Sequence, residues 1–297
     1  MPALDLPAEL VTTEWLAAHL GDPRLVVVDA SVLGVETPAG FRWLSGLDDY
    51  LIAGHVPGAV FADLLEEFSD PEGPYSFTRP DPARLERVAR ELGIDDDVAV
   101  VVYDTSLGHW AARLWWLLTS AGVERVAVLD GGLGRWRADG RALETGFESP
   151  RTAGTLTVSP NDALWAERGE VDAIVAGAAD AALVCALSAS DFRGETGRRA
   201  RRGHIPGSVS VPVTSVVDRE SGTLLRGDAL ETRLAAAVDH DPPGAVGRHG
   251  VRAPAGGASG CRRLRRLARR VGRRPARPVG LARLTVGALR RRVSRRR

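Results

Sequence analysis

The chain has 297 residues, 44% of them hydrophobic, which is enough for two domains with ordinary buried cores. No apolar run reaches the length of about 18 residues that a membrane-spanning helix needs, and two cysteines are too few for a disulfide framework or a zinc cluster. Because the N-terminus also lacks the pattern of a secretory signal, a cytoplasmic protein without membrane association is predicted.

The net charge of +1 conceals two regions of opposite charge. Residues 1–240 carry a net charge of −16, whereas residues 241–297 carry +17, from 18 arginines against one acidic residue. All 39 basic residues of the chain are arginines. The sequence therefore predicts an acidic body followed by a strongly basic segment, and each region needs its own explanation.

The first half of the chain is predicted to alternate short buried strands with helices, which is typical of a parallel sheet covered on both faces. A helix is expected over residues 12–20. The apolar run over residues 25–28 predicts a strand that ends at Asp29. Residues 31–53 are predicted to be mostly loop.

A second helix is expected to begin at Asp81-Pro82, an N-cap followed by a proline in the first turn, and to end at Gly93. A continuous apolar strand over residues 98–103 leads through a short turn into another helix. A further strand over residues 126–129 precedes a second turn, Asp130-Gly131-Gly132-Leu133.

One pentapeptide occurs twice, as Gly54-His55-Val56-Pro57-Gly58 and, 149 residues later, as Gly203-His204-Ile205-Pro206-Gly207. A separation of one domain length predicts a tandem duplication. The second copy lies between predicted strands at residues 182–184 and 209–212, and a helix is expected over residues 230–238. After about residue 240 the expected strand, turn and helix do not follow.

Several motifs in a fixed order resemble the tandem-domain rhodanese family. They are the paired Gly-His-x-Pro-Gly, Val100-Val101-Val102-Tyr103-Asp104, Ala111-Ala112-Arg113-Leu114-Trp115-Trp116 and Leu129-Asp130-Gly131-Gly132-Leu133-x-x-Trp136. The resemblance implies an α/β fold of two tandem rhodanese-like domains, each with a parallel sheet flanked by helices. It places a non-catalytic domain at residues 8–148 and a second domain at 158–240, incomplete after about residue 240.

The resemblance also implies the activity of a thiosulfate or 3-mercaptopyruvate sulfurtransferase. Such enzymes carry sulfane sulfur as a persulfide on one cysteine and pass it to a thiophilic acceptor. The implied partners are a small anionic sulfur donor and a thiol or cyanide acceptor. No metal or organic cofactor is required. The alternative is a catalytically inactive rhodanese-like binding module.

In this family the reactive cysteine opens a tight loop between a strand and a helix, where backbone N–H groups and the helix dipole hold a thiolate. The first repeat has Asp104 at that position, which cannot form a persulfide but can cap the next helix. The spacing of His55 and Asp104 places the second loop near residue 253, where no cysteine stands. Cys261, eight positions later, is the remaining candidate nucleophile, so the catalytic residue stays unidentified.

Three arginines, Arg193, Arg198 and Arg199, lie in the loop where members of the family present arginines to the substrate. The resemblance implies that they bind the anionic donor. The alternative is a charged loop exposed to solvent.

Cys185 stands where the first repeat has Asp29, at the end of a strand. It is interpreted as a small buried residue. His55 and His204 are interpreted as residues that stabilise turns, although either could be mistaken for a catalytic base.

Residues 241–297 contain no aromatic residue, isoleucine, lysine or glutamate. The leading hypothesis is a frameshift near residues 241–246 in a G/C-rich gene. The alternatives are a basic helix that binds nucleic acid through phosphates, or a disordered tail. An incomplete second sheet would leave one group of apolar residues poorly covered, namely Leu183, Val184, Val209 and Val211.

Overall fold

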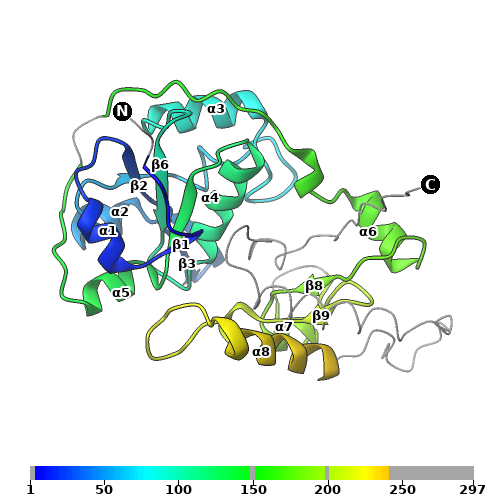
Figure 1. The fold of residues 1–297 in the computed structure, drawn as a ribbon. Coiled ribbons are helices and arrows are strands. Elements are labelled where there is room, and N and C mark those ends of the chain that lie inside the picture. Colours follow the sequence, from blue (N-terminus) through cyan, green and yellow to red (C-terminus); the bar gives the residue numbers. More distant parts are fainter. Residues whose placement is uncertain (1–3, 148–150, 198–200, 241–297) are drawn as a thin grey trace, which may run out of the picture. The chain divides into compact units, whose positions relative to one another are not determined.

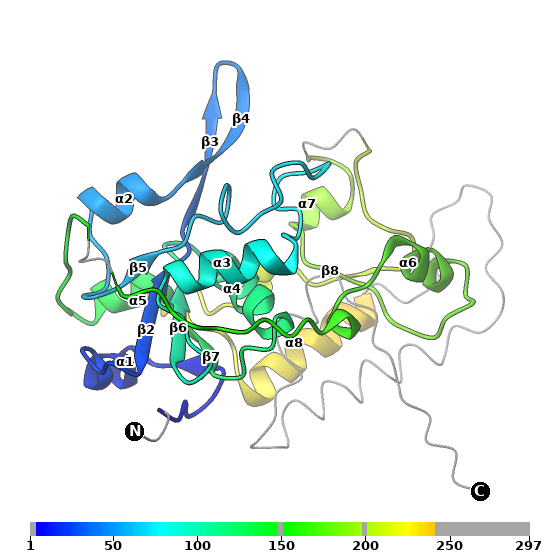
Figure 2. The same cartoon turned by 90° about the horizontal axis from the view of Figure 1, so that it is seen from above.

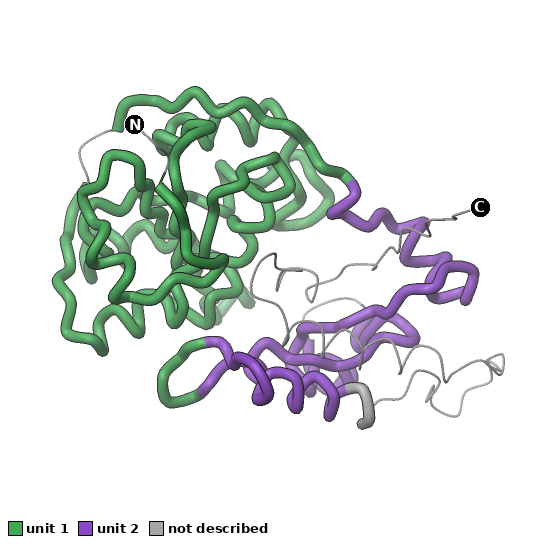
Figure 3. The backbone as a smooth tube through the Cα atoms, in the orientation of Figure 1, with its two compact units in different colours: residues 1–162, 219–223 green, residues 163–218, 224–297 purple. Residues whose placement is uncertain are grey.

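The computed structural model describes residues 4–147, 151–197 and 201–240. The chain divides into two compact units (Figure 3). The first comprises residues 1–162 and 219–223, and the second comprises residues 163–218 and 224–297. The candidate nucleophile Cys261 lies outside the described residues, as do Arg198 and Arg199, which are predicted to bind the donor.

The first unit is built on a five-stranded sheet in the order β1-β7-β6-β2-β5, with every neighbouring pair parallel (Figure 1). Its strands are β1 (Leu10–Val11), β2 (Leu25–Asp29), β5 (Val60–Phe61), β6 (Ala99–Tyr103) and β7 (Val126–Leu129). Its helices are α1 (Thr13–His19), α2 (Leu47–Ile52), α3 (Pro82–Glu91), α4 (His109–Ser120) and α5 (Gly132–Ala138). The predicted α/β class and parallel sheet are confirmed.

Local sequence signals set the helix ends as expected. The Thr12 hydroxyl accepts a hydrogen bond from the backbone N–H of Trp15 at 3.1 Å and caps α1. The Asp81 carboxylate accepts one from the N–H of Arg84 at 2.9 Å, with Pro82 in the first turn of α3. The predicted helices at both places are confirmed.

The prediction that residues 31–53 are mostly loop is wrong. β3 (Val32–Thr37) and β4 (Gly40–Ser45) form an antiparallel hairpin, and α2 follows it. Gly34, which resembles a loop signal, pairs with Trp43 in this ladder. A Cβ atom on Gly34 would lie 2.8 Å from the ring of Phe41, so an aromatic side chain occupies the space that the glycine leaves.

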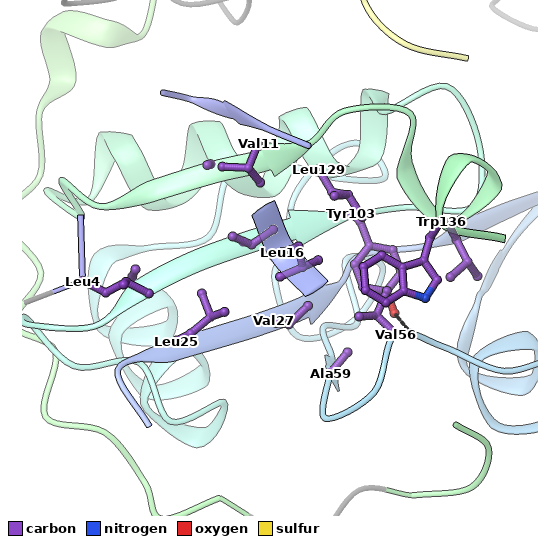
Figure 4. Packing of buried hydrophobic residues seen from close by; sticks show 14 residues of the cluster. Leu4, Val11, Leu16, Leu25, Val27, Val56, Ala59, Tyr103, Leu129 and Trp136 are labelled. Carbon is purple, nitrogen blue, oxygen red and sulfur yellow. Dashed lines mark hydrogen bonds between the residues drawn. The ribbon is translucent and has the colours of Figure 1, made fainter. Parts of the chain in front are cut away.

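The hydrophobic core of the first unit takes alternate residues of the central strands, since successive side chains of a strand point to opposite faces (Figure 4). On one face, Leu16 of α1 and Trp136 of α5 pack in a cluster with Val27 and Val101. α3 and α4 lie on the other face (Figure 2). β2, β6 and β7 are buried along their whole length, which explains why their sequences are continuously apolar.

The described part of the second unit holds a parallel pair of strands, β8 (Val184–Cys185) and β9 (Val209–Ser210). Its helices are α6 (Arg168–Val175), α7 (Ala189–Phe192) and α8 (Gly227–His240). The expectation of poorly covered apolar residues is wrong, because all four of them are buried. Leu230 of α8 and Val216 pack in one cluster with three of the four, Val184, Val209 and Val211.

Candidate functional site

The loop between β6 and α4 is organised around the carboxylate of Asp104, which is fully buried. Its Oδ1 atom accepts hydrogen bonds from the backbone N–H groups of Ser106 at 2.8 Å and Gly108 at 3.0 Å. Its Oδ2 atom accepts hydrogen bonds from those of Trp110 at 2.9 Å and Ala111 at 3.0 Å. We call these four N–H groups the amide cradle. Four converging donors at the N-terminus of a twelve-residue helix make a site for an anion.

The turn after β7 holds the base of this loop. The backbone N–H of Leu133 donates to the carbonyl oxygen of Asp104 at 3.0 Å. Gly132 has a φ of +55°, and a Cβ atom there would lie 2.5 Å from that same oxygen. A glycine is therefore required for the close approach of the two backbones, which gives the Gly131-Gly132-Leu133 motif its physical role.

The neighbouring strand end is also acidic and buried. The Asp29 carboxylate, at the end of β2, accepts a hydrogen bond from the N–H of Ser31 at 2.8 Å. Burial raises the pKa of Asp29 to about 6, and the nearby Asp104 charge adds to this shift. The Ser31 hydroxyl in turn accepts from the N–H of Thr105 at 3.1 Å, so the end of β2 supports the loop.

Aromatic side chains surround the start of α4. The centroid of the Trp110 ring lies 5.1 Å from that of Trp43 in the hairpin, with the two rings edge to face. It lies 4.8 Å from the centroid of the Phe77 ring, which is tilted against it. Burial lowers the pKa of His109 below its usual range, and it lowers the pKa of Arg113 to about 10. Sequence reasoning missed this cluster, because its hairpin members lie in the region that was predicted to be loop.

The two pentapeptides have the same geometry. His55 Nδ1 donates to the carbonyl of Tyr50 at 2.9 Å, and the two rings stack at 3.7 Å. His204 Nδ1 donates to the carbonyl of Phe192 at 2.7 Å, also with rings stacked at 3.7 Å. Each imidazole thus ties its turn to the preceding helix. This is the turn-stabilising role expected of both histidines.

Strand pairing shows that Asp29 and Cys185 are equivalent positions. Asp29 pairs with Phe61, six residues after His55. Cys185 pairs with Ser210, six residues after His204. Cys185 is half-buried at the end of β8. It therefore matches the support position of the first repeat and not the loop position of Asp104.

Arg193 lies just after α7 with its guanidinium already engaged. Nε and Nη2 donate to the two carboxylate oxygens of Glu195 at 2.6 and 2.8 Å. This exposed pair is geometrically bidentate, and it raises the pKa of Arg193. The other two predicted donor-binding residues, Arg198 and Arg199, lie outside the described residues.

Neither a metal site nor a membrane span is found in the part of the chain that the structure describes. No group of three or more His, Cys, Asp or Glu side chains there could hold a metal ion. No helix there is long and apolar enough to cross a membrane.

Comparison with known proteins supports the family resemblance that the sequence motifs indicate. A model of the rhodanese-like domain matches residues 12–139. A putative thiosulfate sulfurtransferase, SseB, of Mycobacterium tuberculosis is 40% identical over 240 residues, covering 78% of this chain and 80% of the relative. The 3-mercaptopyruvate sulfurtransferase of Escherichia coli is 34% identical over 239 residues, with 78% and 81% covered. The crystal structure of SseA from Escherichia coli superposes with a TM-score of 0.67 at 31% identity, covering 79% of this chain and 84% of that one.

Proposed function

Because the chain belongs to the rhodanese family, we propose that its fold serves the transfer of sulfane sulfur from thiosulfate or 3-mercaptopyruvate to a thiol or cyanide. The amide cradle is the observation that supports this proposal most directly. A cradle of this kind around a cysteine would stabilise its thiolate and then the persulfide anion. In the first repeat the Asp104 carboxylate occupies that position and takes up all four donors.

The proposed reaction has two steps. A cysteine thiolate attacks the outer sulfur of the donor, forms the S–S bond of a persulfide, and releases sulfite from thiosulfate or pyruvate from 3-mercaptopyruvate. A thiol or cyanide then attacks the outer sulfur of the persulfide, and the cysteine thiolate leaves. Asp104 cannot perform either step, so the sulfur carrier belongs to the second repeat.

In the second repeat the cysteine loop is missing from the sequence as it stands. We attribute this to a frameshift near residues 241–246, after the domains at residues 8–148 and 158–240. The matches to the relatives leave about a fifth of the chain uncovered, the share that residues 241–297 would account for. Resequencing the gene and translating the other two frames tests this explanation, which fails if neither frame restores a cysteine loop.

Mass spectrometry after incubation with thiosulfate tests where sulfur is carried. We expect no added sulfur atom on this chain. A persulfide on Cys261 would contradict that expectation, and in that case Arg198 and Arg199 would be the next residues to replace. A cytoplasmic location belongs to the same proposal, because it rests on the low cysteine count, and cell fractionation checks it.

A further inference from the structure

The first unit has a pocket of about 560 Å³ that the sulfur chemistry does not use. Its wall includes Glu9, which immediately precedes β1, and Val126, the first residue of β7. Trp115 and Thr119 from the second half of α4 complete this side. These residues lie where strands begin and where α4 ends. The pocket is therefore at the N-terminal ends of the strands, whereas the amide cradle is at their C-terminal ends. Its volume is in the range of pockets for small ligands.

The charge of the pocket is negative. Glu124 and Asp162 line it together with Glu9, and none of the described residues in its wall is basic. Arg79, which is not part of the wall, pairs with the exposed Asp162 at 2.9 Å. The C-terminal end of α4 adds the negative pole of a helix dipole. A ligand of this pocket is therefore expected to be a cation.

Two polar groups in the wall have no partner among the residues that the structure describes. Burial raises the pKa of the Glu9 carboxyl to about 7, and among the described residues no side chain donates to this carboxyl or pairs with it. The Thr119 hydroxyl oxygen is fully shielded and also has no hydrogen-bond partner in the described structure. The half-buried Glu9 carboxyl is the one of the two that a ligand in the pocket could reach, and N–H donors would recover the stability that its lack of a partner costs.

We propose that this pocket binds a small organic cation, an alkylguanidinium or alkylamine, whose N–H groups donate to Glu9 and whose apolar stem lies against Trp115. The indole N–H of Trp115 already donates to the carbonyl of Val126 at 2.9 Å, which fixes the ring. A fixed aromatic wall beside an unpaired carboxylate combines the two contacts that such a cation requires.

Calorimetry on the full chain with n-butylguanidinium tests the proposal, and n-butylurea serves as the neutral probe of the same shape. The cation is expected to bind at least about tenfold more tightly than the urea. Glu9→Gln is expected to weaken cation binding by about tenfold and to leave urea binding unchanged. Glu14→Gln, on the exposed first turn of α1, is the matched control and is expected to change neither.

The pH dependence gives a second readout. Because a carboxyl with a pKa near 7 ionises above that value, cation affinity is expected to rise between pH 6 and pH 8 in the native chain but not in Glu9→Gln. The other charged groups at the pocket, Glu124, Asp162 and its partner Arg79, are the same in both chains, so the comparison isolates the contribution of Glu9. Equal binding of the two probes, or equal loss in Glu9→Gln and Glu14→Gln, would overturn the proposal. An unfolding midpoint of Glu9→Gln that is no lower than that of the native chain shows that any loss of binding is local.

Discussion

Replacing Asp104 by asparagine tests whether the amide cradle requires two anionic acceptor atoms. The carboxylate has one oxygen for each pair of N–H donors. Asparagine has the same shape but only one acceptor oxygen, so in either orientation two backbone N–H groups would face an NH₂ group. A buried donor without an acceptor costs about 1–3 kcal/mol, which predicts a loss of about 2–6 kcal/mol in the free energy of unfolding.

Urea unfolding followed by tryptophan fluorescence measures this loss, because six of the seven tryptophans lie in the first unit. Asp97→Asn is the control, since its side chain is 98% exposed and its contact with Arg125 is 3.4 Å long. That change is expected to stay within about 0.5 kcal/mol. A loss below about 1 kcal/mol for Asp104→Asn would refute the reasoning that the four donors depend on the charge and shape of this side chain.

Three further predictions concern the same loop and its supports. Asp104→Cys is expected to give a thiol whose pKa lies below the ordinary value of about 8.5, as measured by the pH profile of alkylation. An ordinary pKa would show that the amide cradle does not stabilise a thiolate. Gly132→Ala is expected to destabilise the chain by at least about 2 kcal/mol, because its Cβ atom would lie 2.5 Å from the Asp104 carbonyl oxygen. Gly134→Ala in the same helix has open space around its Cβ atom and is expected to stabilise the chain by up to about 1 kcal/mol. Equal effects of the two changes on the unfolding midpoint would contradict this. Because burial raises the pKa of Asp29, its ionised form destabilises the fold, and stability is expected to fall as the pH rises from about 4 to about 6. Asp29→Asn is expected to raise the free energy of unfolding by about 2–3 kcal/mol at pH 7 and by little at pH 4. A gain that does not depend on pH would be the contrary result.

Much of the fold could be predicted because its signals are local. The apolar runs of β2 and β6 are buried on both faces, and Asp81-Pro82 begins α3 by a cap that involves only neighbouring residues. The hairpin was missed because Gly34 serves the packing of Phe41, a partner that only the fold brings close. A propensity rule interprets such a glycine as a loop signal.

The site was predictable in position and not in detail. The motif placed Asp104 at a strand-to-helix turn, but the directions of four backbone N–H groups depend on the loop conformation and on the support of Leu133. The equivalence of Cys185 and Asp29 was expected from spacing and is confirmed by the pairing of strands. The pocket beside Glu9 had no sequence signal, because its wall combines residues that are distant in the chain.

Thiocyanate formation from cyanide and either thiosulfate or 3-mercaptopyruvate tests whether this chain has the fold of a sulfurtransferase but lacks the reactive cysteine loop of the second repeat. Little or no thiocyanate is expected from the chain as it stands, and turnover is expected once a frame that restores the cysteine loop is expressed. Robust turnover by the present chain that Cys261→Ser abolishes would contradict this expectation.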